Sequence, residues 1–161
     1  ARFSKIKSPA EVVAGTLRLV GDWQFPRPGI DDIGQQPGYM GQAILDPPSV
    51  EGWNTGREWI NSGSLLARVN FVADRVGNTS LPGVKNIIAD MKSKGVSTPE
   101  QLVAASLEHM GYLELADETK EQLLEHAKGN GNLDWSNEDS AGTQIGEILA
   151  MVGATTEYQF G

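Results

Sequence analysis

The chain of 161 residues contains no cysteine, which excludes disulfide bonds, thiolate catalysis and cysteine-based metal sites. Basic residues are also scarce: 13 Lys and Arg stand against 21 Asp and Glu, giving a formal net charge of −8. This balance argues against a nucleic-acid-binding protein and against electrostatic docking on an anionic membrane. No apolar run approaches the roughly 18 residues of a membrane-spanning segment. Contact with a membrane is therefore expected only through a partner.

Charge, proline and tryptophan are distributed unevenly along the chain. Residues 1–80 carry eight basic and eight acidic side chains, whereas residues 81–161 carry five and thirteen, so the net charge of −8 belongs to the second part. Six of the eight prolines and three of the four tryptophans lie in the first part. A chain of this length suits one domain. We predict a single domain over residues 1–161, with a neutral, loop-rich, Trp-containing half (1–80) and an acidic helical half (81–161).

Helical periodicity dominates the sequence, and strand patterns are nearly absent. Two helix starts are clear: Ser8-Pro9-Ala10-Glu11 and Thr98-Pro99-Glu100-Gln101 each combine a capping side chain, a proline in the first turn and a Glu or Gln three residues after the cap. Glycine follows most of the apolar repeats and predicts where they stop. The expected helices cover about 9–20, 64–76, 84–94, 99–110, 117–128 and 136–152, with one more turn over 154–160.

The segment between the first two strong helices has a different character. Prolines and glycines in residues 22–38 predict a long irregular excursion with at most a short helical turn. Residues 39–45 are expected to form a short helix that Pro47-Pro48 prevents from continuing. The predicted fold is mainly α, with about six or seven helices around one core and a Pro/Gly/Trp-rich irregular face over residues 22–62.

Catalytic and cofactor-binding patterns are weak. His109 and His126 each fall late in a predicted helix, where the helix dipole favours histidine. The alternating oxygen side chains of residues 130–138 lack the glycine and the distal glutamate of a calcium loop, so a polar turn followed by a helix cap is the preferred interpretation. We predict no catalytic residue, no cofactor and no metal, and an enzyme is the less favoured hypothesis.

The most distinctive stretch, residues 46–61, combines a Pro-Pro step, two tryptophans six residues apart and a single arginine. Two interpretations stay open: a tryptophan-anchored crossover between helices, or a ligand cleft suited to sugars or carboxylates. Aromatic residues in this half also suit burial against a protein partner. The candidate interface or cleft residues are Trp23, Phe25, Trp53, Arg57 and Trp59.

Several strings in this half carry a family resemblance. They are residues 6–13 (IKSPAEVV), 40–42 (MGQ), 46–53 (DPPSVEGW), 59–61 (WIN) and 65–71 (LLARVNF), joined by the closing 156–160 (TEYQF). Together they resemble an uncharacterised bacterial family, domain of unknown function 1800. Members are longer, so the resemblance implies that this chain corresponds to the C-terminal third of one. It also implies export to the periplasm or cell surface, and it transfers no catalytic role to any residue.

These observations lead to two functional hypotheses. The first is a non-enzymatic structural or protein-interaction domain of an exported protein. In this hypothesis the domain binds protein partners and is an extrinsic or stabilising subunit of a larger assembly. That assembly could be a membrane-bound complex. The alternative is a fragment of an exported enzyme or carbohydrate-binding protein with its cleft at residues 46–61.

Overall fold

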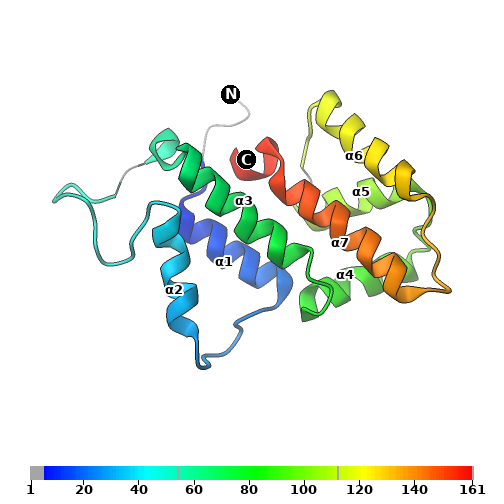
Figure 1. The fold of residues 1–161 in the computed structure, drawn as a ribbon, viewed down its shortest axis with the longest axis horizontal. Coiled ribbons are helices and arrows are strands. Elements are labelled where there is room, and N and C mark those ends of the chain that lie inside the picture. The colour runs from blue at the N-terminus through cyan, green and yellow to red at the C-terminus, as the bar shows by residue number, and fades with distance from the viewer. Residues whose placement is uncertain (1–5, 54, 112, 161) are drawn as a thin grey trace.

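A computed structural model describes residues 6–53, 55–111 and 113–160. These residues form eight α-helices and one 3-10 helix, η1, and include no strand (Figure 1), so the mainly α fold is confirmed. The helix bounds are α1 (Pro9–Val20), α2 (Ile30–Tyr39), η1 (Gly56–Trp59), α3 (Ser62–Val76), α4 (Pro82–Ser93), α5 (Pro99–His109), α6 (Asp117–Asn130), α7 (Glu138–Ala154) and α8 (Thr156–Phe160).

Helices α3 and α7 pack against each other at the centre of the molecule. Helices α1 and α2 cover α3 on one side, whereas α4, α5 and α6 pack around α7 (Figure 1). The central crossing is close because glycines of α7 face α3: a Cβ on Gly146 would lie 2.8 Å from the carbonyl oxygen of Gly77, and one on Gly153 would lie 2.7 Å from Val72. One continuous core therefore joins the neutral and the acidic parts of the chain.

The expected helix starts at Ser8 and Thr98 are confirmed in detail. The Ser8 hydroxyl accepts a hydrogen bond from the backbone N–H of Glu11, and the Glu11 carboxylate accepts one from the backbone N–H of Ser8 at 2.8 Å. Thr98 and Gln101 make the equivalent reciprocal pair at the start of α5. Both capping boxes satisfy backbone donors that have no partner within the helix.

The structure differs from the prediction between residues 22 and 45. Residues 30–39 form α2 where an irregular excursion was expected, and the short helix predicted over 39–45 is wrong, because the helix ends at Tyr39. Half-buried Ile33 and the buried Pro37 and Met40 share one face by their spacing of four and three residues. Burial of that face against the rest of the domain outweighs the low helix propensity of this glycine-rich, proline-containing segment.

A buried arginine of α3 fastens both ends of the described chain. The Arg68 side chain is buried, and its Nη1 donates to the backbone carbonyl of Lys7 at 2.9 Å, while its Nη2 donates to the backbone carbonyl of Gln159 at 3.2 Å. Burial lowers the pKa of Arg68. Burial, and secondarily the nearby Arg68 charge, also lower the pKa of Lys7. The segments before α1 and within α8 are thereby fixed to the same helix.

Candidate functional site

The most unusual surface of the molecule is an arm, which we define as residues 41–53. It follows α2, leads towards η1 and extends away from the helical body (Figure 1). Leu45 is 90% exposed, Val50 is fully exposed and Ile44 is half-exposed. The arm carries the acidic residues Asp46 and Glu51 and no Lys or Arg. It therefore presents branched apolar side chains beside negative charges.

Specific hydrogen bonds fix the base of the arm. The side-chain oxygen of Gln42 accepts a bond from the backbone N–H of Ala10 at 2.9 Å, which attaches the arm to the start of α1. The indole N–H of Trp53, near the end of the arm, donates to the carbonyl of Ala43, near its start, at 3.0 Å. This bond holds the two ends of the arm together. Leu45 adopts a left-handed backbone with φ of 69°, which is uncommon for a residue with a side chain. The arm is consequently preformed.

A groove lies where η1 meets Ile6 and α8. It has a volume of about 390 Å³, and its lining residues are Ile6, Arg57, Ile60, Thr156 and Phe160. The buried ring of Trp59 anchors η1, and the carbonyl of the same residue accepts a hydrogen bond from the Ser64 hydroxyl at 2.6 Å. Arg57 is exposed and forms no ion pair with any residue that the structure describes. The groove is thus apolar, with one cation at its rim.

The five candidate residues predicted from the sequence fall in two separate places. Trp23 lies after α1, with the Arg27 guanidinium 4.0 Å from the centre of its ring, and Phe25 next to it is 82% exposed. Trp53 closes the arm, whereas Arg57 and Trp59 belong to η1. Asp22, the neighbour of Trp23, binds Arg75 near the end of α3, whereas Trp59 binds Ser64 near its beginning. These two contacts lie about 16 Å apart along the helix. Within residues 46–61, Arg57 and Ile60 line the groove, while Asp46 to Val50 project on the arm.

An ion-pair cluster around the buried carboxylate of Asp22, which sequence reasoning missed, lies next to Trp23. The carboxylate of Asp22 is 6% exposed and binds Arg27 at 2.6 Å and Arg75 at 2.5 Å. It forms the floor of a polar hollow of about 600 Å³ between α2 and α3, with Asn70 and Asp74 among its lining residues. The sequence signal was an acid directly after a helix-ending glycine, where the helix dipole disfavours negative charge unless a cation compensates for it.

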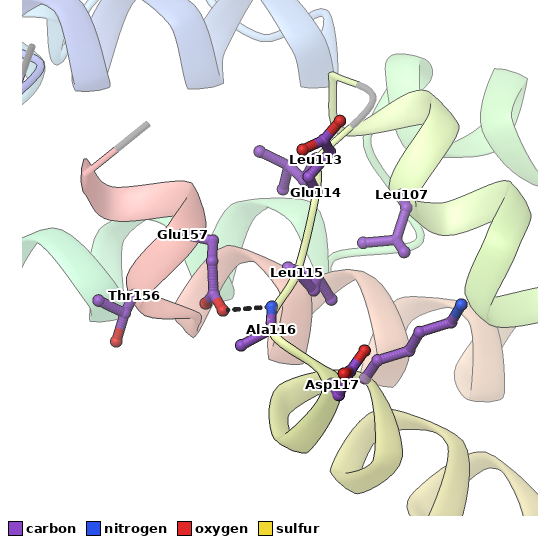
Figure 2. A pocket seen from close by; sticks show the side chains of 9 residues that line it. Leu107, Leu113, Glu114, Leu115, Ala116, Asp117, Thr156 and Glu157 are labelled. Atoms are coloured by element: carbon purple, nitrogen blue, oxygen red, sulfur yellow. Dashed lines mark hydrogen bonds between the residues drawn. The ribbon is translucent and has the colours of Figure 1, made fainter. Parts of the chain in front are cut away.

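A second hollow lies beside α8, between α5 and the connection to α6 (Figure 2). It measures about 580 Å³, and Leu107, Leu113 and Leu115 supply apolar walls. The Glu157 carboxylate faces the connection, and its Oε1 accepts a bond from the Ala116 N–H at 3.0 Å (Figure 2). The same oxygen accepts a bond from the Thr119 hydroxyl at 3.1 Å. Through this one oxygen the carboxylate supplies an acceptor to the start of α6, whereas its buried Oε2 has no hydrogen-bond partner among the described residues.

The pKa of Glu157 reflects two opposing effects. Burial raises the pKa, but the hydrogen bonds from Ala116, from the N–H of Glu157 itself and from Thr119 outweigh burial and place the pKa below its ordinary value. The carboxylate is therefore ionised at neutral pH.

Both histidines pair with acids of neighbouring helices. His109 Nε2 lies 2.9 Å from Asp90 Oδ2, and His126 Nε2 lies 3.4 Å from Glu147 Oε2. In the 130–138 segment, Asp134 Oδ1 accepts bonds from the N–H and hydroxyl of Ser136, forming a local turn. Over residues 6–53, 55–111 and 113–160, no three His, Asp or Glu side chains converge as metal ligands do. Nor does any helix in these ranges combine the length and apolar character needed to cross a bilayer.

Comparison with known proteins gives one result that covers the chain. A family model described as "Protein of unknown function (DUF1800)" matches residues 1–160. The chain belongs to this family, which confirms the resemblance seen in its sequence motifs. No curated protein and no solved structure matches the chain.

Proposed function

We propose that this chain is a protein-interaction domain and a structural component of a larger assembly, and that the arm is its docking element. One observation carries the proposal: Leu45 and Val50 are held almost wholly in solvent on a preformed arm. Complete burial of each such side chain against a partner is worth about 1.5–3 kcal/mol. Since the base of the arm is already fixed, docking requires little additional ordering of the chain.

The arm's chemistry supports binding to protein rather than catalysis. Residues 41–53 contain no His, Lys, Arg or Cys, and the Ser49 hydroxyl already accepts a hydrogen bond from the Glu51 N–H at 3.2 Å. Apolar side chains bordered by Asp46 and Glu51 suit a partner surface with an apolar centre and a basic rim.

A second part of the proposal is that the protein works outside the cytoplasm as a subunit of an exported assembly, as the resemblance of its sequence motifs implies. Fractionation of the native host tests this part. An antibody against the chain should detect it in the periplasmic or surface fraction, and detection only in the cytoplasmic fraction contradicts export.

Site-specific photo-crosslinking in the native host tests the docking role. A photoreactive amino acid at Leu45 should give a discrete covalent adduct, whereas the same amino acid at Ala104, exposed on α5, should not. When Val50→Asp is introduced into the chain that carries the photoreactive amino acid at position 45, the adduct should disappear. The thermal stability of the domain should not fall, because Val50 is fully exposed. Absence of any discrete adduct from Leu45, or equal adducts from both sites, contradicts the proposal.

A further inference from the structure

We infer that the partner of the arm is a second copy of this chain, and that the arm of one copy docks in the groove of the other. This inference rests on the proposed function, because it identifies the partner of the same arm. The groove is the one lined by Ile6, Arg57, Ile60, Thr156 and Phe160. Leu45 and Val50 would enter this groove, and Asp46 and Glu51 would face Arg57.

The two surfaces match in polarity and in charge. The arm offers branched aliphatic side chains and two carboxylates with no cation. The groove offers apolar walls from Ile6, Ile60 and Phe160, and the exposed guanidinium of Arg57. Each surface therefore supplies what the other lacks, and a carboxylate beside Arg57 can form a planar, charge-assisted contact. The groove volume of about 390 Å³ lies within the range of small binding pockets.

The geometry favours contact between copies over contact within one copy. The bond from the Trp53 indole to the Ala43 carbonyl closes the base of the arm, and the arm then extends away from the body and from α8 (Figure 1). The groove lies on the body side, where η1 meets α8. Because the arm leads into η1, both surfaces lie at the same end of the molecule. Two copies that face each other with this end can exchange arms around a twofold axis and close a dimer.

The energetic expectation is a weak, concentration-dependent dimer. Each contact buries a few side chains, so the interface falls in the small, transient class unless other surfaces contribute. The contact of the acidic arm with Arg57 favours association, whereas the net charge of −8 on each copy opposes it.

Sedimentation equilibrium over a range of concentrations tests the inference with single variants. Leu45→Asp disables the arm and Arg57→Glu disables the groove, and each should weaken self-association at least tenfold. Leu66→Asp changes a leucine that is 60% exposed on α3, outside arm and groove, and Lys85→Glu reverses an exposed charge on α4. These two matched controls should associate like the unmodified chain, and circular dichroism melting should show that all four variants fold.

A mixing experiment gives the decisive result. Leu45→Asp retains an intact groove and Arg57→Glu retains an intact arm, so an equimolar mixture should associate more strongly than either variant alone. No recovery in the mixture, a monomeric unmodified chain at every concentration, or equal weakening by Leu66→Asp overturns the inference. If the chain stays monomeric while Leu45 still gives a discrete photo-adduct in the host, the docking role stands and the self-association fails.

Discussion

Glu157 Oε1 accepts the backbone N–H of Ala116 at 3.0 Å, so a residue of α8 caps α6 from a position 41 residues after the cap residue of that helix. Ala116 has no side-chain acceptor of its own, and Glu157 also accepts the hydroxyl of Thr119 in the first turn of α6. The start of α6 is therefore stabilised by tertiary structure rather than by its local sequence. This contact also fastens α8 to the body.

Replacing Glu157 by Ala should lower the free energy of unfolding by about 1–3 kcal/mol, because two donors at the start of α6 lose their acceptor. Glu157→Gln keeps an acceptor oxygen and should cost less. Chemical denaturation measures both values. Glu121→Ala, at an exposed position on α6, is the control and should change stability by less than about 0.5 kcal/mol. A Glu157→Ala protein as stable as the control would contradict the capping role.

The same carboxylate predicts a pH dependence. The pKa of Glu157 is lower in the folded protein than its ordinary value of 4.5, so the unfolded state binds the proton more readily. Its contribution to stability is therefore complete above the unfolded pKa and is lost as pH falls through the lower folded pKa. Unfolding measured from about pH 3 to about pH 7 should show the gap between the unmodified chain and Glu157→Gln closing at the acidic end. A gap that does not change with pH would show that ionisation of Glu157 is irrelevant.

Gly146 and Gly129 offer a matched pair of helix glycines. A Cβ at Gly146 would lie 2.8 Å from the backbone oxygen of Gly77, whereas one at Gly129 would meet nothing within 4 Å. Gly146→Ala should therefore destabilise the domain by about 1–3 kcal/mol through the clash at the α3–α7 crossing. Gly129→Ala should stabilise it by about 0.5–1 kcal/mol because alanine favours the helix. Thermal melts of the two variants should shift in opposite directions, and shifts of the same sign would contradict the close crossing.

Arg68 predicts a large effect for a conservative change. Its guanidinium reaches the carbonyls of Lys7 and Gln159 at once, and a lysine ammonium at the same place cannot repeat that fork. Arg68→Lys should cost about 1–3 kcal/mol of unfolding free energy, because buried carbonyls lose their donors. Arg18→Lys, on the exposed side of α1, should be almost neutral. Equal stabilities of the two variants would refute the role given to Arg68.

Trp53→Phe should loosen the arm without weakening the domain. The change removes the indole N–H that binds the Ala43 carbonyl while it keeps an aromatic ring. Limited proteolysis should then cut within residues 41–53 several times faster, and the melting temperature should stay the same. Trp135→Phe, which removes an indole bond to the Val96 carbonyl elsewhere, should leave the arm cleavage rate unchanged. Unchanged cleavage in Trp53→Phe would mean that other contacts hold the arm.

Much of the fold follows from local signals in the sequence. The capping boxes at Ser8 and Thr98 and the apolar repeats predicted helices that the structure places within a few residues. Helix α2 was missed because its propensity is poor, and only its burial through Pro37 and Met40 makes it helical. Burial by tertiary contacts leaves no local signature in a single sequence.

The candidate site was predictable only in part. The tryptophans drew attention to residues 46–61, but in the structure their contacts are internal: Trp59 anchors η1 and Trp53 closes the arm. The side chains left in solvent are instead Leu45 and Val50, which lie in a proline-rich stretch without periodicity. Whether an aliphatic residue in such a stretch is buried depends on where the chain turns, so the sequence pattern could not distinguish them from core residues.

The Arg68 contacts also determine how the domain would bear mechanical load. Lys7 and Gln159, which lie near opposite ends of the chain, are bound to one side chain of α3. Tension applied between these two points would load that guanidinium, and the contact between the Lys7 ammonium and the Tyr158 ring, along a shorter path than the one through α1, α3 and α7. Arg68 would therefore act as a mechanical clamp for anything attached at either end.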